Sequence, residues 1–288
     1  MEQQYILKNC KSFELKDIFE CGQCFRWNPN EDGSYTGVFG NNVINVSKKE
    51  NGDVLFGGVC EGNIQTICEE YFDIKRDYEK IKETLSQEDE NLAESIKCGK
   101  GIRILNQDLW ETIISFIISA NNNIPRIKGI IERISKKYGK EIKFRGNSYY
   151  TFPTIESLNK ASIKDLRDLG LGFRDKYIYN TTKLIIKKQI NIEELKEKET
   201  TIEMRNELLK LSGVGPKVAN CILLFSDLKR MDVFPIDVWV RRVMNELYIH
   251  NPDEAKVSKK QIEEIAENKF GELRGVAQQY LFYWKREN

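Results

Sequence analysis

Leu211-Ser-Gly-Val-Gly-Pro-Lys-Val-Ala-Asn-Cys221 is the stretch of this chain that decides its fold. The segment before it, residues 200–211, predicts a helix, because it opens with Thr-x-x-Glu capping-box spacing and carries apolar residues on one side. Gly213 and Gly215 predict a tight turn, and Pro216 suits the first position of a second helix, where its missing N–H costs nothing. The segment therefore predicts a helix-hairpin-helix unit.

Two charged residues accompany this hairpin. Lys217 lies at the start of the second helix, and Asp237 follows twenty residues later in the segment 234–239. Bare N–H groups at a helix N-terminus suit a phosphate, so the hairpin indicates DNA binding. Many DNA-binding proteins carry such a hairpin and lysine without any chemistry, and Asp237 alone would serve as the N-cap of a helix from Val238. Catalysis therefore has to be argued from the rest of the chain.

Length and composition set the broad class. A chain of 288 residues, 40% apolar and 31% charged, predicts a globular protein with a large core and two domains. The longest apolar stretch, residues 113–120, is too short for a membrane span, and the N-terminus resembles no signal peptide. We expect an intracellular protein, cytoplasmic in a prokaryote, that has no membrane contact and is monomeric.

The cysteines and the single histidine restrict the chemistry. Seven cysteines favour free thiols, and Cys21-x-x-Cys24 has the spacing of half a zinc site or a redox pair but has no second such pair. His250 is the only histidine, which nearly excludes histidine-based triads and histidine-rich zinc sites. Lys, Asp, Glu, Cys, Tyr or Ser must supply any acid, base or nucleophile, and we expect neither a metal nor another cofactor.

The charge is balanced overall but uneven along the chain. A net charge of +1 argues against binding nucleic acid by bulk electrostatics. Residues 126–145 nevertheless contain eight basic and two acidic side chains. This basic stretch is either a solvated helix face or a flank that approaches DNA.

The pattern along the chain predicts an α+β protein. Residues up to about 60 are β-rich, with expected strands at 24–27, 34–39, 43–46 and 54–56 separated by hairpin turns. The pattern becomes helical from residue 64, and 97–101 is a plausible boundary. We therefore expect an antiparallel β domain over 1–98 and a mostly helical domain over 99–288.

Several helices of the second domain have clear signals. A capping box at Asp108 and Glu111 opens an expected helix to residue 120, and further helices are expected from Ser162 and Phe173. The last expected helix, 272–286, has a core stripe made of Leu273, Val276, Ala277, Tyr280, Leu281 and Trp284.

A second stripe of this last helix holds Arg274, Gln278 and Phe282. It is either ordinary helix surface or part of a nucleobase pocket, in which an amide reads the Watson–Crick edge and a ring stacks on the base.

Six segments occur in an order that resembles a known family. They are 22–27 (GQCFRW), 119–126 (SANNNIPR), 169–174 (LGLGFR), 211–221, 235–237 (PID) and 277–282 (AQQYLF). Together they resemble the bifunctional 8-oxoguanine DNA glycosylase/lyases of the eukaryotic type, across nearly the whole chain. This resemblance implies a TATA-binding-protein-like β domain followed by a helical helix-hairpin-helix domain. It also implies double-stranded DNA containing oxidised guanine as the partner.

The resemblance also implies catalytic and base-binding roles. Lys217 is then the nucleophile that attacks the sugar C1′, and Asp237 supports the developing oxocarbenium charge. The Gly22 carbonyl accepts the N7–H that 8-oxoguanine has and guanine lacks. Gln278 reads the Watson–Crick edge, while Phe282 and Cys221 sandwich the flipped base.

A second group of residues is implied to hold the duplex. Asn121 fills the space that the flipped base leaves. Arg126 and Arg174 bind the orphaned cytosine, and Phe173 wedges beside it. Gly213 and Gly215 form the hairpin that approaches the phosphates.

Elementary chemistry is consistent with these roles. A nucleophilic lysine must be neutral, and burial lowers the pKa of an amine while a nearby carboxylate raises it. Cys221 follows Lys217 by four residues, so their side chains share one helix face. An arginine fork suits the O2 and N3 acceptors of cytosine.

The chain departs from the family pattern at several positions. Trp239 replaces a histidine and Phe173 replaces a tyrosine. Lys285 lies nearest the position of an expected acidic residue, and Asn220 and Cys24 replace other small polar residues. These departures concern fine specificity more than the reaction itself.

Three rival assignments differ in testable features. Endonuclease III-like and adenine-specific relatives carry an iron–sulfur cluster held by four cysteines after the aspartate, but here no cysteine follows Cys221. Alkylation-repair relatives lack the lysine. A non-catalytic DNA-binding module would keep the glycine hairpin without needing Asn121 or the pair Gln278 and Phe282.

Overall fold

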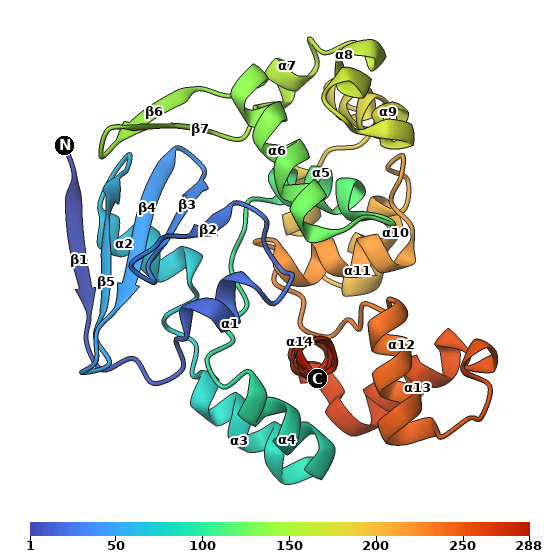
Figure 1. Cartoon of the computed structure of the whole chain (residues 1–288). Helices are drawn as coiled ribbons and strands as arrows, with labels where there is room; N and C mark the ends of the chain where they lie inside the picture. The colour runs from blue at the N-terminus through green and yellow to red at the C-terminus, as the bar shows by residue number, and fades with distance from the viewer.

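The computed structural model describes residues 1–288, with the exception of the side chain of Glu88. A five-stranded antiparallel sheet occupies one side of the molecule and a larger group of helices occupies the other (Figure 1). The C-terminal helix lies near the middle, where the two groups meet. This is the expected α+β arrangement, in which a sheet domain precedes a helical domain.

The sheet is formed by β1 (Gln3–Leu7), β2 (Trp27–Pro29), β3 (Tyr35–Phe39), β4 (Asn42–Lys48) and β5 (Val54–Val59). The strand order is β1-β5-β4-β3-β2, so β2 to β5 form a meander and β1 pairs with its last strand. The strands expected at 34–39, 43–46 and 54–56 are confirmed. The expected strand over 24–27 is wrong except at Trp27, because residues 22–26 turn toward the helices. The sequence pattern also did not predict β1.

Aromatic side chains fill the core of the sheet domain. Helices α1 (Leu15–Phe19) and α2 (Ile64–Tyr71) pack against the sheet. The rings of Phe19 and Trp27 stack with centroids 4.2 Å apart, and those of Phe39 and Tyr71 stack at 3.8 Å. Such pairs add about 0.5–1.5 kcal/mol each beyond the area that they bury. This core therefore anchors the segment 22–27, which enters the site described below.

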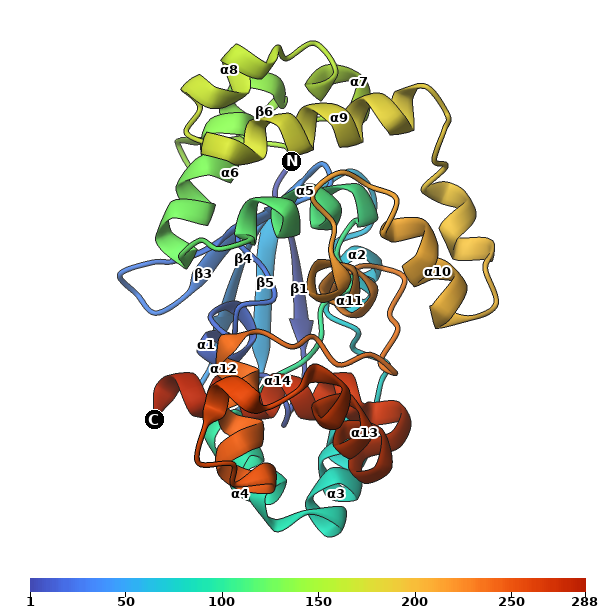
Figure 2. The same cartoon turned by 90° about the vertical axis from the view of Figure 1, so that its right-hand side faces the viewer.

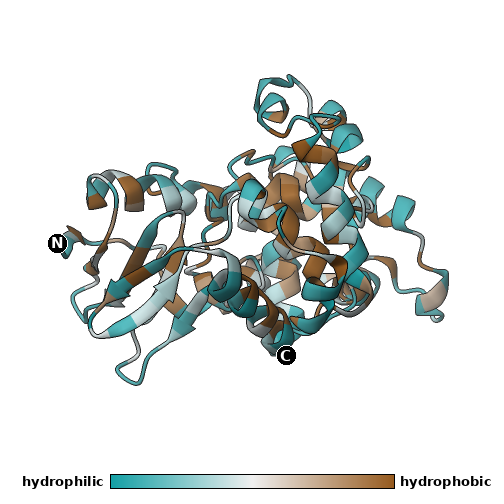
Figure 3. Cartoon of the chain, turned by 90° about the horizontal axis from the view of Figure 1, so that it is seen from above, coloured by the Kyte–Doolittle hydropathy of each residue, from teal (hydrophilic) through white to brown (hydrophobic). Residues whose placement is uncertain are grey.

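The helices after α2 are α3 (Tyr78–Glu88), α4 (Glu90–Cys98), α5 (Leu109–Ser119), α6 (Ile124–Tyr138), α7 (Ile155–Leu158), α8 (Ile163–Asp168), α9 (Asp175–Ile186), α10 (Thr201–Leu208), α11 (Pro216–Phe225), α12 (Val238–Met244), α13 (Lys259–Phe270) and α14 (Arg274–Glu287). Of these, α5 and α11 are buried along most of their length and pack against each other. Figure 2 shows α11 between α5 and α14, and Figure 3 shows apolar residues concentrated in this part of the molecule. None of the helices in the described chain has the length and apolar character of a membrane span.

The last helix confirms four members of the expected core stripe, while Leu273 and Trp284 are only partly buried against the same core. Val276, Ala277, Tyr280 and Leu281 are fully buried. Helix α4, from the first half of the chain, and helix α12, from the second half, both pack against α14. Residues of α3 and α4 belong to the same apolar core as those of α5 and α11. The C-terminal helix therefore holds the first half of the chain against the second half.

Two features of the second half differ from the expectation. A hairpin of β6 (Glu141–Phe144) and β7 (Asn147–Tyr150) lies in a region expected to be helix and loop. The sequence did not predict it because its strands are too short to show a long alternating pattern. At the start of α5, Asp108 accepts from the Glu111 N–H at 2.8 Å as a cap should. The Glu111 carboxylate instead lies 3.8 Å from Arg26, so the expected reciprocal capping box is wrong.

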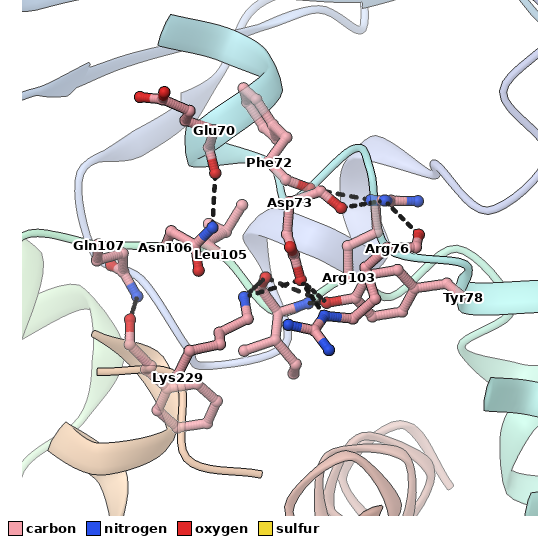
Figure 4. A network of polar contacts seen from close by, with 12 residues as sticks. Glu70, Phe72, Asp73, Arg76, Tyr78, Arg103, Leu105, Asn106, Gln107 and Lys229 are labelled. Atoms are coloured by element: carbon pink, nitrogen blue, oxygen red, sulfur yellow. Dashed lines mark hydrogen bonds and ion pairs between the residues drawn. The ribbon is translucent and has the colours of Figure 1, made fainter. Parts of the chain in front are cut away.

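A buried polar network joins the sheet domain to the helical domain (Figure 4). Arg103 donates to the carbonyls of Phe72 at 3.0 Å and Asp73 at 2.6 Å, and its guanidinium lies 4.3 Å from the centre of the Tyr78 ring. Lys229, from the α11–α12 connection, lies 3.3 Å from the Asp73 carboxylate. Burial lowers the pKa of Lys229 to about 7, although the nearby Asp73 carboxylate acts to raise it. The network fixes the start of the connection that carries Asp237.

Candidate active site

The helix-hairpin-helix unit forms as expected. Thr200 and Glu203 make the full capping box of α10, although the helix ends at Leu208 and a turn fills the remaining residues to Leu211. Gly213 has a φ of +85°, and a Cβ there would lie 2.8 Å from a Tyr177 side-chain atom, so both conformation and space require glycine. Gly215 is the N-cap of α11, with open space where a side chain would be. The α11 N-terminus is therefore bare enough for a phosphate.

Lys217 and Asp237 line one small cavity of about 40 Å³. Its lining comes from the sheet domain, α5, α11, the α11–α12 connection and α14, and consists of Cys21, Gly22, Phe116, Lys217, Cys221, Phe225, Pro235, Asp237, Gln278, Gln279 and Phe282. All six residues expected to perform catalysis or hold the base are among them. Distant parts of the sequence thus meet at the start of the hairpin helix.

The charge of Lys217 is set by opposing effects. Burial lowers the pKa of its amine, but the interaction with the Cys221 side chain and the charge of Asp237 raise it by more, so the pKa of Lys217 lies above its ordinary value. Burial raises the pKa of the Cys221 thiol, although the neighbouring Lys217 lowers it. The Lys217 nitrogen also lies 5.6 Å from the centre of the Phe116 ring, which favours a cation. Lys217 in the free protein is therefore an ammonium ion.

This charge state predicts a pH dependence for any reaction in which Lys217 is the nucleophile. Only the neutral amine attacks, and its fraction rises roughly tenfold per pH unit below the pKa. We expect the single-turnover rate of borohydride trapping to rise steadily from about pH 6 to about pH 9, measured at saturating enzyme. A flat profile would contradict this and would mean that bound DNA itself removes the proton.

The Asp237 side chain both caps a helix and lines the cavity. One carboxylate oxygen accepts from the Val240 N–H at 2.8 Å, so the residue is the N-cap of α12, as its sequence position alone suggested. The same residue lines the cavity with Lys217. Capping uses a single oxygen, so the second oxygen stays free to face a developing positive charge.

The residues expected to bind the base lie around the same cavity, which is too small for a base. Gln278 is 4% exposed, and its side-chain oxygen has no hydrogen-bond partner among the described residues. A Cβ on Gly22 would lie 3.2 Å from the Phe282 ring, so the ring packs directly on the glycine. A cavity of 40 Å³ holds a few waters and not a purine. The Phe282 ring must therefore move before a base can enter.

Sequence reasoning missed two glutamines that hold Gly22 in place. Gln23 is fully buried and bonds the Ile18 and Arg103 carbonyls and the Leu105 N–H at 2.7–2.9 Å. Gln279 donates to the Cys21 carbonyl at 2.5 Å. Both glutamines lie inside segments that carried the family resemblance. Each directly follows a residue implied to contact the base, and this position could have indicated a supporting role.

The residues expected to hold the duplex lie together at a surface beside the cavity. Asn121 has a φ of +49° and is exposed, in the loop between α5 and α6. Arg174 is buried and donates to the carbonyls of Ala120 and Asn121, which fixes that loop. Phe173 is 57% exposed, an unusual state for a large apolar ring. Arg126 lies near Gly172 and next to the Arg174 charge.

Most of the basic stretch at 126–145 contacts the protein itself. The five cations bound to other groups of the chain are Lys128 (Trp27 carbonyl), Arg133 (Leu169 carbonyl), Lys137 (Asp165), Lys143 (Glu141) and Arg145 (Glu2). The stretch therefore stabilises α6 and the β6–β7 hairpin rather than presenting a uniform basic flank.

The residues that differ from the family pattern contact neighbouring side chains of this protein. Trp239 is 40% exposed beside the cavity mouth, and Arg242 lies 5.3 Å from the centre of its ring. Lys285 pairs with Glu246 at 2.5 Å. Cys24 is buried with Cys21, and both are free thiols.

A glycine hairpin that presents a half-buried lysine and a capping aspartate beside a small cavity lined by an amide and an aromatic ring defines the class of helix-hairpin-helix DNA glycosylases. Residues 114–270 match the family described as "HhH-GPD superfamily base excision DNA repair protein", and residues 5–113 match "8-oxoguanine DNA glycosylase, N-terminal domain". The chain belongs to this superfamily and carries the N-terminal domain of its 8-oxoguanine branch.

Relatives and solved structures agree with this assignment. A probable N-glycosylase/DNA lyase of Methanothermobacter thermautotrophicus is 34% identical over 80% of this chain and 77% of its own length. The N-glycosylase/DNA lyase OGG1 of Arabidopsis thaliana is 28% identical, covering 92% of this chain and 75% of its own. The Clostridium acetobutylicum 8-oxoguanine glycosylase/lyase, solved with double-stranded DNA containing cytosine opposite 8-oxoguanine, is 45% identical. It covers 100% of this chain and 98% of its own with a TM-score of 0.93.

Proposed function

We propose that this protein excises 8-oxoguanine from duplex DNA, preferably opposite cytosine, and then cleaves the strand at the resulting site. The observation that carries the proposal is the convergence of Lys217, Cys221, Asp237, Gln278 and Phe282 on one buried cavity at the hairpin. The protein is an N-glycosylase and DNA lyase that acts on double-stranded DNA. We further propose that it acts as a monomer inside the cell.

Binding starts at the hairpin and at the loop of Asn121. The bare α11 N-terminus takes a phosphate of the damaged strand, since its N–H groups and the helix dipole favour an anion. Asn121 fills the gap left by the flipped base, and the exposed Phe173 ring wedges beside the orphaned cytosine. Flipping costs a few kcal/mol, which these contacts partly offset. The base displaces the Phe282 ring and enters between that ring and Cys221.

Catalysis proceeds through a covalent bond between Lys217 and the sugar. The Lys217 ammonium first loses a proton, and the neutral amine then attacks C1′ as the bond to the base breaks and the base leaves with the electron pair. Asp237 stabilises the positive charge on the sugar during this step. One proton of the new C1′-bound amine passes to the ring oxygen as the C1′–O4′ bond breaks, which opens the sugar and gives a protonated imine on Lys217. Loss of a proton from C2′ then expels the 3′ phosphate by β-elimination. Water then releases the lysine.

The proposal is tested by cleavage of duplexes that carry 8-oxoguanine opposite each of the four bases, with borohydride trapping of the product complex. A Schiff-base lyase crosslinks to lesion DNA, and a non-catalytic DNA-binding module does not. Absence of both excision and crosslinking in active-site-titrated enzyme would refute the proposed function.

The opposite base gives a separate prediction. Arg126 and Arg174 are proposed to read cytosine, where a good bidentate contact is worth about 1–3 kcal/mol. Because Arg174 already bonds the 120–121 carbonyls, we expect Arg126→Ala to lower the C-over-A preference without unfolding the loop. Arg174→Ala should lower the preference as well and also loosen Asn121. The measurement is the ratio of single-turnover rates for 8-oxoguanine paired with C and with A. Equal rates in the unmodified protein would show that both arginines merely contact phosphate.

A further inference from the structure

Arg286 lies beside the cavity of Lys217 and Asp237, and none of the roles proposed above involves it. It follows Phe282 by four residues on α14, so it lies one turn further along the same face. It lines the wider hollow that adjoins the small cavity, together with Gly22, Lys217, Asp237 and Phe282. Its side chain is only 19% exposed.

One half of the Arg286 guanidinium is held by the protein. Nη2 donates to the Glu20 carbonyl and lies 3.2 Å from a Glu287 carboxylate oxygen. The guanidinium carbon lies 5.6 Å from the centre of the Phe282 ring and 5.4 Å from that of Tyr283. These contacts fix the position of the group beside the cavity.

The other half is buried and unsatisfied. Nη1 has no hydrogen-bond partner among the described residues, and it lies 3.7 Å from the point that a Cβ on Gly22 would occupy. A buried charged donor without an acceptor is costly, so an acceptor from outside the free protein is expected here. The Gln278 oxygen is unpaired in the neighbouring part of the site. Two orphaned polar groups thus flank the space that a base would fill.

We propose that Arg286 determines specificity by donating Nη1 to the C8 oxygen of the flipped base. The inference rests on the proposed function. A base whose N7–H faces the Gly22 carbonyl presents its C8 substituent beside it, and in 8-oxoguanine that substituent is a carbonyl oxygen. Guanine has a hydrogen atom there, which accepts nothing. Gly22 then reads N7, Arg286 reads C8, and guanine fails both tests.

The test compares the binding of two duplexes that differ only at this base. One carries 2′-fluoro-8-oxodeoxyguanosine opposite cytosine and the other carries 2′-fluorodeoxyguanosine, since the fluorine disfavours the oxocarbenium ion and prevents excision. In Arg286→Met the ratio of the two affinities should fall about ten- to a hundredfold, the range of one hydrogen bond to a charged group. Arg286→Lys should restore part of the ratio. Affinity for a tetrahydrofuran abasic analogue, which has no base, should stay unchanged.

A matched control is Lys16→Met, which removes a cation that pairs with the same Glu287 carboxylate at 3.3 Å but does not line the cavity. It should leave the ratio unchanged. Thermal unfolding of every variant shows whether the Glu20 contact is needed for folding. If Arg286→Met does not fold, the affinity ratios of Arg286→Lys and Arg286→Gln are compared with that of the unmodified protein instead.

The other outcomes are distinguishable. Equal loss of affinity for all three duplexes would make Arg286 a phosphate contact and overturn the inference. Tighter binding of all base-containing duplexes would mean that Arg286 only holds Phe282 in its closed position, which overturns it as well. An unmodified protein that does not distinguish the two fluorinated duplexes would instead refute the proposed function itself.

Discussion

Replacement of Lys217 by glutamine is expected to abolish base excision and borohydride trapping while leaving the affinity for lesion DNA within a few-fold of normal. Removal of a covalent nucleophile costs about 10⁴-fold or more in turnover. Glutamine is polar and only one atom shorter than lysine, so the hairpin and cavity should remain intact. The measurements are single-turnover excision, borohydride trapping and a binding titration with 8-oxoguanine opposite cytosine.

The control for this prediction comes from the same hairpin. Lys210 lies just before the hairpin glycines, is exposed and pairs with Glu207 at 2.6 Å. Lys210→Gln therefore removes a hairpin lysine without altering the cavity and should trap normally. Continued trapping by Lys217→Gln would show that another amine is the nucleophile.

The hairpin could be predicted because its signals are local. The turn needs a positive φ at Gly213, the helix needs a proline at its first position, and the capping box of α10 spans only Thr200 to Glu203. Each of these requirements is satisfied within a few residues. The stripe that contains Gln278 and Phe282 was also readable, since helical periodicity puts both residues on one face.

Other features depend on contacts between distant residues. Strand β1 forms because Gln3–Leu7 pairs with β5, some fifty residues away, which no local pattern announces. The buried bonds of Gln23 reach Arg103 and Leu105, and Arg286 reaches Glu20 from the other end of the chain. The raised pKa of Lys217 also depends on the fold, because the sequence could not decide between burial and the charge of Asp237.

Replacement of Asp237 by asparagine is the second change with a large expected effect, and it separates the two functions of this residue. Asparagine caps a helix as well as aspartate does, so the bond to the Val240 N–H and the stability of α12 should be retained. The charge that we propose to face the sugar is lost. We expect single-turnover excision to fall by about two to three orders of magnitude, the range for loss of one group that stabilises a developing charge.

The pH profile of this variant adds a second readout. Asp237 raises the pKa of Lys217, so its neutralisation should lower that pKa and make more of the amine neutral at a given pH. The residual activity of Asp237→Asn should therefore level off at a lower pH than that of the unmodified protein. Asp77→Asn, which caps α3 through the Lys80 N–H at 3.0 Å and does not line the cavity, is the matched control and should be fully active. Near-normal excision by Asp237→Asn would reduce Asp237 to a helix cap, and the sugar cation would then be stabilised by the DNA phosphates instead.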